Sequence, residues 1–297
     1  MGAGSADRSE RPHRPGYGRP VPILTTPDGV ALAVHDFGGD GPDLLLAHAT
    51  GFHAHAWLPV AERLRDRFRC VSFHQRGHGD SPTPPDRDFS WWGFAEDALA
   101  VCAALGLDRP FAAGHSCGGA LLLMGEERHQ GSYRAIYAYE PIVYPVGLRD
   151  GPMPNPLAAG ARRRREGFAS RQEAYENYAS KLPFSVLSAE GLHAYVDHGF
   201  DDLEDGSVRL KCRGEDEALT YENSSPAGAY DDLRRVGCPV TLACGRDTTA
   251  IGPAVLALQA ERLPHVRTEV LDGLTHFGPL QAPDVVAASI AGALSAG

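Results

Sequence analysis

A serine between two glycines has the surroundings that nucleophilic chemistry requires. Ser116 lies in the pentapeptide Gly-His-Ser-Cys-Gly at 114–118, between an apolar strand-like run at 111–113 and a helix-like run at 119–124. This pattern at the junction of a strand and a helix is typical of a nucleophile elbow, a tight turn that exposes the serine hydroxyl above a sheet. The flanking glycines permit a strained backbone and close packing of the helix on the strand. We therefore predict that Ser116 is a nucleophile.

A serine hydroxyl attacks poorly unless a base takes its proton and an acid fixes the tautomer of that base. His276 lies in a glycine-bounded loop after the strand-like run 268–271, and we predict that it is the base. Asp247 follows the strand-like run that ends at Cys244, and we predict that it orients His276. Glu140, which ends the strand-like run before Pro141, is the alternative acid. The order Ser, Asp, His along the chain agrees with the nucleophile-elbow template.

Acyl transfer also needs backbone amides directed at the developing oxyanion. One is predicted to be the amide of Cys117, directly after the nucleophile. The second is predicted in the loop 48–53, which follows a strand-like run, with Thr50 as the first choice and Phe52 as the second.

Two other interpretations of these residues are less favoured. Cys117 presents its amide rather than its thiol to a substrate when it follows the nucleophile, so we do not predict it as the nucleophile. A metal site is suggested by four histidines, but no carboxylate follows at the spacing of metallohydrolases, so we predict no metal. These histidines are His53, His55, His74 and His78.

Strand-like and helix-like segments alternate along most of the chain after residue 20. The predicted strands are 30–34, 43–47, 70–73, 111–113, 135–139, 238–243 and 268–271. The predicted helices are 56–67, 91–105, 117–129, 253–263 and 284–294. Such repetition implies right-handed crossovers and a mostly parallel central sheet flanked by helices, an α/β fold.

The alternation stops at Pro141 and resumes near residue 229. We predict a core of 21–141 and 229–297, a helical cap inserted at 142–228, and a disordered tail at 1–20. The cap contains aromatic residues, which are expected to pack within it or to line an apolar pocket. They are Phe168, Tyr175, Tyr178, Phe184, Tyr195 and Phe200.

Composition narrows the class of protein and its partners. The 297 residues suffice for one large α/β domain, and no apolar run is long enough to cross a bilayer. The net charge of -10 disfavours nucleic acid, and the basic run 162–165 is interpreted as a solvated helix face. The six cysteines lack CxxC spacing, so neither a disulfide framework nor a zinc ribbon is expected. We predict a cytoplasmic protein with a small-molecule substrate and no membrane or nucleic-acid partner; the oligomeric state stays open.

Several of these segments together resemble the α/β-hydrolase superfamily, and the resemblance covers nearly the whole chain after the tail. The segment 48–57 is similar to its His-Gly loop, with Ala49 in place of Gly, and 74–81 is similar to its D-x-R-G-x-G-x-S turn, with His74 in place of Asp. The elbow and the segments 244–247 and 275–277 match in order and spacing. The resemblance implies no metal or organic cofactor.

The predicted function is hydrolysis of a carboxylic ester, thioester or lactone through an acyl-enzyme. The resemblance leaves open C–C bond hydrolysis, cofactor-free perhydrolase and hydroxynitrile lyase activity on the same residues, and a ligand receptor that has kept them. A serine at the elbow disfavours haloalkane dehalogenase and classical epoxide hydrolase chemistry, since those enzymes need a carboxylate there.

Overall fold

The computed structural model describes residues 22–145 and 155–294, which are built around a main sheet of eight strands. The strand order is β1-β2-β4-β3-β5-β6-β10-β11. The bounds are β1 Ile23–Thr25, β2 Ala31–Gly38, β3 Asp43–Ala47, β4 Arg69–Phe73, β5 Phe111–His115, β6 Ile136–Tyr139, β10 Val240–Gly245 and β11 Val266–Leu271. All neighbours from β4 to β11 pair in parallel, whereas β2 runs antiparallel to both β1 and β4. The predicted α/β fold is confirmed, and β1 is an additional strand. The predicted tail at 1–20 lies outside the described residues.

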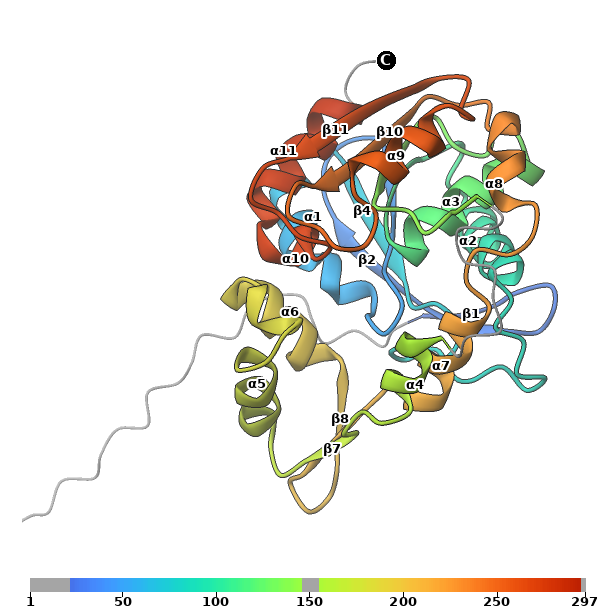
Figure 1. Cartoon of the computed structure of the whole chain (residues 1–297). Coiled ribbons are helices and arrows are strands. Elements are labelled where there is room, and N and C mark those ends of the chain that lie inside the picture. The colour runs from blue at the N-terminus through green and yellow to red at the C-terminus, as the bar shows by residue number, and fades with distance from the viewer. Residues whose placement is uncertain (1–21, 146–154, 295–297) are drawn as a thin grey trace, which may run out of the picture.

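Helices cover both faces of this sheet (Figure 1). Their bounds are α1 Leu58–Leu64, α2 Trp91–Leu105, α3 Cys117–Arg128, α8 Ala229–Asp232, α9 Pro253–Ala260, α10 Gly278–Gln281 and α11 Pro283–Leu294, with short 3₁₀ turns η1 Ala54–Trp57 and η3 Leu233–Arg235. The predicted bounds of α2 are confirmed, whereas the predicted helix 56–67 is divided into η1 and α1.

The strand β3 shows how the sequence builds a core on each face. Successive side chains of a strand point to opposite faces. Leu44 and Leu46 pack in a buried cluster with residues of α1 and α11, whereas Leu45 and Ala47 belong to a second cluster with residues of α2, α3 and α9. An apolar run such as 43–47 is therefore buried on both faces, as the strands of a parallel sheet usually are.

The segment between β6 and α8 lies beside the main sheet rather than in it (Figure 1). Its elements are α4 Pro156–Ala161, β7 Gly167–Phe168, α5 Arg171–Ala179, η2 Phe184–Val186, α6 Ala189–His198, β8 Phe200–Asp202, β9 Val208–Leu210 and α7 Gly214–Glu222. The three strands form a separate antiparallel sheet in the order β7-β9-β8. The predicted helical cap thus contains a small sheet in addition to its helices, because strands of two or three residues are too short to give an alternating pattern. We call residues 155–228 the cap segment.

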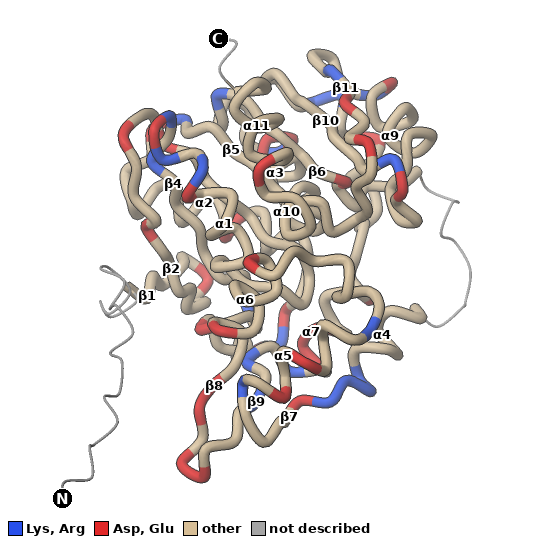
Figure 2. Tube along the Cα trace, turned by 90° about the vertical axis from the view of Figure 1, so that its left-hand side faces the viewer, with Lys and Arg blue, Asp and Glu red and all other residues tan. Residues whose placement is uncertain are grey.

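Charged residues of both signs are interleaved in the cap segment (Figure 2). Arg162 pairs with Glu215 and Glu222, and Arg165 pairs with Glu173. Among the described residues, no helix combines the length and apolarity that crossing a membrane requires. The cytoplasmic location stays a prediction.

Candidate active site

The turn between β5 and α3 holds Ser116 in a strained conformation. Ser116 has φ 56° and ψ -115°, a backbone region that residues with side chains rarely adopt. A Cβ atom on Gly114 would lie 2.5 Å from the Gly118 backbone, and one on Gly118 would lie 2.1 Å from the Ala47 carbonyl oxygen. Both glycines are thus required for α3 to begin directly against β3 and β5. Non-glycine strain of this kind is concentrated at functional sites.

His276 lies in the loop between β11 and α10, where several contacts hold it beside the elbow. His115, the residue before Ser116, has its Nε2 atom 2.7 Å from the carbonyl oxygen of His276. The hydroxyl of Tyr139 donates to the carbonyl of Thr275 at 2.7 Å. Since Tyr139 ends β6 and His115 ends β5, the two neighbouring strands both hold the loop of His276.

The carboxylate at His276 is that of Glu140. Its Oε2 atom lies 2.7 Å from Nδ1 of His276, and the Glu140 side chain is fully buried. The same carboxylate accepts hydrogen bonds from the Gly245 amide at 3.0 Å, from the Thr248 hydroxyl at 2.8 Å and from the Ile251 amide at 3.3 Å. The carboxylate thus accepts hydrogen bonds from these three groups and from Nδ1–H of His276, which leaves Nε2 of His276 free to accept a proton.

This arrangement corrects the prediction that Asp247 orients His276. Asp247 is exposed, and its amide donates to the carbonyl of Leu274 at 2.9 Å. The turn after β10 contributes the hydroxyl of Thr248 to Glu140 instead. The physical reason is that β6 and β10 are neighbours whose carboxyl ends lie at the same sheet edge, so either strand can supply the acid.

The loop after β3, predicted to hold the second oxyanion donor, is packed directly against the elbow. A Cβ atom on Gly118 would lie 2.1 Å from the carbonyl oxygen of Ala47 and 2.7 Å from that of His48, so the start of this loop lies close to Gly118. The amide of Phe52 donates to the carbonyl of Ala49 at 3.1 Å. Phe52 is therefore already engaged in a turn, which corrects its place as the second choice for an oxyanion donor.

His48 holds this loop in shape through both ring nitrogens. Its Nε2 atom accepts from the Gln75 amide at 3.0 Å, so its Nδ1 proton is donated to the Ala49 carbonyl at 2.8 Å. Gln75 also donates from its side chain to the His48 carbonyl at 2.5 Å. Thr50 is buried beside this network and stays the candidate for the second oxyanion amide, together with the amide of Cys117.

Aromatic side chains of the cap segment lie over the loops of Thr50 and His276. The ring of Phe184 lies 5.7 Å from that of Phe52 and 6.2 Å from that of Phe277, the residue after His276. Tyr195 packs 5.1 Å from Phe52. Phe168, Tyr178 and Phe200 are buried in the same apolar cluster, and Tyr175 packs against it. The cap segment thus supplies an apolar cover near the elbow.

Arg164 is a partly buried cation in this cover. It pairs with Glu217 and donates to the hydroxyls of Tyr178 at 3.1 Å and Tyr195 at 2.5 Å. Glu217 Oε1 would lie 2.6 Å from a Cβ atom on Gly51, which places this pair on the loop of Thr50. The interpretation of 162–165 as a solvated helix face is therefore wrong for Arg164, because the run follows α4 and turns one side chain inward.

Histidines gather behind the same loop. The group comprises His35, His48, His53, His55, His74, His78 and His198. Burial lowers the pKa of His35 to about 4 and that of His53 to about 3, so both rings are neutral at pH 7. His53 links the loop to the cap segment, since its Nε2 atom lies 3.0 Å from the carbonyl oxygen of Tyr195.

Comparison with known proteins places these features in a family. Residues 44–289 match the model of the alpha/beta hydrolase family. The chain is 32% identical over 257 residues to N-formylmaleamate deformylase of Pseudomonas putida, a match that covers 82% of this chain and 85% of the relative. It is 28% identical over 248 residues to the magnesium-chelatase 30 kDa subunit of Rhodobacter capsulatus, covering 79% and 80% of the two chains.

A solved structure shows the same fold. The crystal structure of E-2-(acetamidomethylene)succinate hydrolase superimposes with a TM-score of 0.80 at 20% identity, covering 93% of this chain and 99% of the other. The similarity extends over the cap segment as well as the main sheet, since so much of both chains is matched.

Proposed function

The chain belongs to the alpha/beta hydrolase family of enzymes, and we propose that it is a serine hydrolase that forms an acyl-enzyme on Ser116. The observation that supports this proposal most strongly is the contact of 2.7 Å between His276 Nδ1 and the buried Glu140 carboxylate. A base oriented by a buried acid, beside a serine on a strained elbow, is the arrangement that nucleophilic acyl transfer needs.

The proposed steps follow from these hydrogen bonds. Because Glu140 accepts the Nδ1 proton, Nε2 of His276 can take the proton of the Ser116 hydroxyl as the oxygen attacks a carbonyl carbon. The amides of Cys117 and Thr50 stabilise the negative charge on the carbonyl oxygen of the tetrahedral intermediate. His276 then returns the proton to the leaving group, and water activated by the same histidine releases the acid.

We propose a small carboxylic ester, thioester or lactone as the substrate. A second candidate, hydrolysis of an N-formyl or N-acyl amide, is favoured by the relative at 32% identity, whose name describes deformylation of N-formylmaleamate. The apolar cover formed by Phe52, Phe184 and Phe277 suits a small acyl group in either case.

Labelling with a fluorophosphonate tests the nucleophile. We expect one label per chain on Ser116, burst release of p-nitrophenol from short-chain p-nitrophenyl esters, and loss of both in Ser116→Ala. The variant Ser132→Ala is a matched control, because Ser132 is partly buried and bonds to His129 away from the elbow. Labelling that persists in Ser116→Ala would overturn the proposal.

A panel of small substrates separates the reaction types. Esters, lactones, N-formyl amides and vinylogous diketones are compared on wild type and Ser116→Ala by rates of product formation. Preference for an N-formyl amide over the matched ester would favour the second candidate, and cleavage of the diketone alone would point to a C–C bond hydrolase. A ligand receptor would take the label slowly and turn over none of these compounds.

A further inference from the structure

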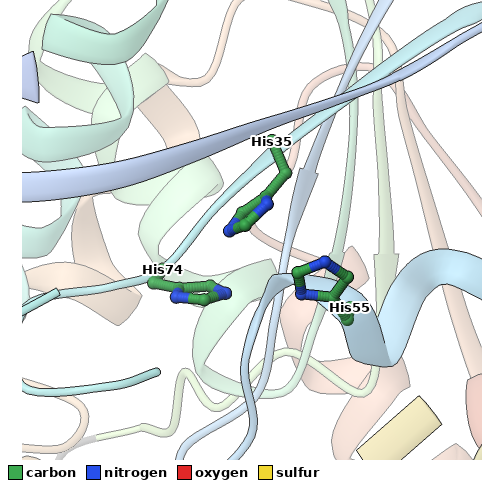
Figure 3. A group of neighbouring side chains, drawn as sticks. All are labelled: His35, His55 and His74. Carbon is green, nitrogen blue, oxygen red and sulfur yellow. The ribbon is translucent and has the colours of Figure 1, made fainter. Parts of the chain in front are cut away.

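Three histidine rings from three elements face one another behind the loop of Thr50 (Figure 3). His35 belongs to β2, His55 to η1, and His74 directly follows β4. One ring nitrogen of each lies within 4.8 Å of the corresponding atoms of the other two. His35 Nε2, His55 Nδ1 and His74 Nε2 are buried and have no hydrogen-bond partner among the described residues. Buried polar atoms are seldom left without partners, so this group calls for an occupant.

We propose that His35, His55 and His74 bind one divalent transition-metal ion of the zinc class. The site differs from the candidate active site. Within the described part of the chain, the rings of these three histidines contact one another and rings of β2, the loop 48–53 and α6, rather than His276. The four histidines that suggest a metal in the sequence do not include His35, which is distant in sequence and joins His55 and His74 through the pairing of β2 with β4.

The ligand set and its spacing suit such an ion. Imidazole is a preferred ligand of zinc, copper and nickel, whereas calcium and magnesium require oxygen. Two nitrogens bound to one tetrahedral zinc ion at about 2.0–2.1 Å lie about 3.4 Å apart. Nitrogens now within 4.8 Å of each other therefore need to close by about 1.4 Å at most. Three protein ligands leave the fourth position to water, and the partial exposure of His35 provides a route of entry.

Asp80 couples metal binding to the turn 74–81. His74 Nδ1 now accepts from the Asp80 amide at 2.6 Å, and it lies 3.7 Å from Asp80 Oδ2. If Nε2 of His74 binds the metal, the ring proton must be on Nδ1. There it would face the hydrogen of the Asp80 amide, and that hydrogen bond would be lost. A small shift of the turn lets the Asp80 carboxylate accept this proton instead, as the carboxylate partners of metal-bound histidines commonly do. Asp80 is thus assigned as a positioning residue of the site.

Equilibrium dialysis of the full chain against micromolar Zn²⁺, followed by elemental analysis, tests the proposal. We expect wild type to retain one equivalent of zinc, and Co²⁺ in its place to give the visible absorption of a tetrahedral site. Ser116→Ala should bind equally well, so this result is independent of the proposed catalytic serine. Failure of folded wild type to retain zinc would overturn the proposal.

Single substitutions identify the ligands. Asp80→Ala removes a residue that orients a ligand and should weaken zinc binding by roughly 10- to 100-fold. His35→Gln and His55→Gln each remove a ligand itself and should weaken zinc binding by more than that. His129→Gln and His193→Gln, which remove exposed histidines, are the matched controls.

Circular dichroism on each variant separates loss of ligands from loss of fold. His35→Gln and His55→Gln change rings that are less buried than that of His74, so at least these two are expected to fold as wild type does. Zinc retained by both folded variants would show that it binds elsewhere and would contradict the assignment.

Discussion

At the scale of single residues, Glu140 combines two features that are rarely found together. Its backbone φ is 47°, in the left-handed region that side chains disfavour, and its carboxylate is fully buried among four donors. A conformation of this kind costs of order 1–3 kcal/mol and persists where the surroundings impose it. The turn after β6 therefore holds the carboxylate at His276 against a local preference for another conformation.

Replacement of Glu140 distinguishes the two acids that the sequence offers. Glu140→Gln is expected to lower kcat by about 10⁴-fold, the loss that the equivalent Asp-to-Asn change causes in the serine-protease template, because the amide no longer selects the Nδ1-protonated tautomer. Asp247→Asn should leave kcat close to that of wild type, because Asp247 is exposed. Steady-state kinetics on an ester substrate measures both. The reverse result would restore Asp247 as the orienting acid.

The choice between these acids could not be made from the sequence. Asp247 and Glu140 each follow a strand that ends at the same edge of the sheet, and both fit the order of the template. What separates them is the direction of a side chain, which depends on the left-handed turn at Glu140 and on hydrogen bonds from Gly245, Thr248 and Ile251. Those donors come from a segment more than a hundred residues away in the chain.

At the scale of elements, the junction of β5 with α3 leaves no room for a side chain at Gly118. Gly118→Ala would place a Cβ atom 2.1 Å from the Ala47 carbonyl oxygen and 2.7 Å from that of His48. We expect the free energy of unfolding to fall by about 3 kcal/mol or more, at the upper end of overpacking changes, because both contacts are backbone atoms that cannot move aside.

Gly160→Ala is the matched change in a helix with free space. Apart from its chain neighbours and the backbone of α4, no atom of the described residues lies within 4 Å of the position of its Cβ. Since α4 also gains helix propensity, stability should rise by about 0.5–1 kcal/mol. Urea denaturation of both variants checks the pair. Equal effects at the two glycines would contradict the close packing described at Gly118.

Elements with strong apolar patterns could be predicted, and short ones could not. The strand at 43–47 and the helix at 91–105 have the bounds that their apolar runs predict. In contrast, β7, β8 and β9 hold two or three residues each, which is too few to show a period of two. The histidine group was missed in part for a related reason, since His35 joins it through an antiparallel pairing that no local pattern reveals.

At the scale of the whole molecule, one buried carboxyl group makes stability depend on pH. Glu127 in α3 is 1% exposed, and within residues 22–145 and 155–294 neither of its oxygens has a hydrogen-bond partner. Burial raises its pKa from 4.5 to about 9. Between pH 4.5 and pH 9 the folded chain therefore keeps a proton that the unfolded chain loses. The free energy of unfolding is not lowered by this group below pH 4.5, and it falls progressively as the pH rises towards 9.

Glu127→Gln should remove this dependence. The gain in unfolding free energy relative to wild type is expected to be smallest near pH 4.5 and to grow by at most about 1.4 kcal/mol per pH unit up to pH 9. Chemical denaturation at several pH values measures it, with the exposed Glu62→Gln as the control. A gain that does not change with pH would show that Glu127 is ionised in the folded chain.

Because Glu140 directly follows β6, two of the three proposed catalytic residues lie in the first half of the chain. Ser116 and Glu140 both precede the cap segment, whereas His276 follows it, and the two parts of the main sheet meet only where β6 pairs with β10. If the chain were cut within the cap segment, one fragment would carry Ser116 and Glu140 and the other would carry His276. The main sheet would then be divided between β6 and β10. Two such fragments are expected to be inactive alone and are therefore suited to a complementation assay. If each is fused to one of two interacting proteins, hydrolase activity would report that the interaction had restored the pairing of β6 with β10.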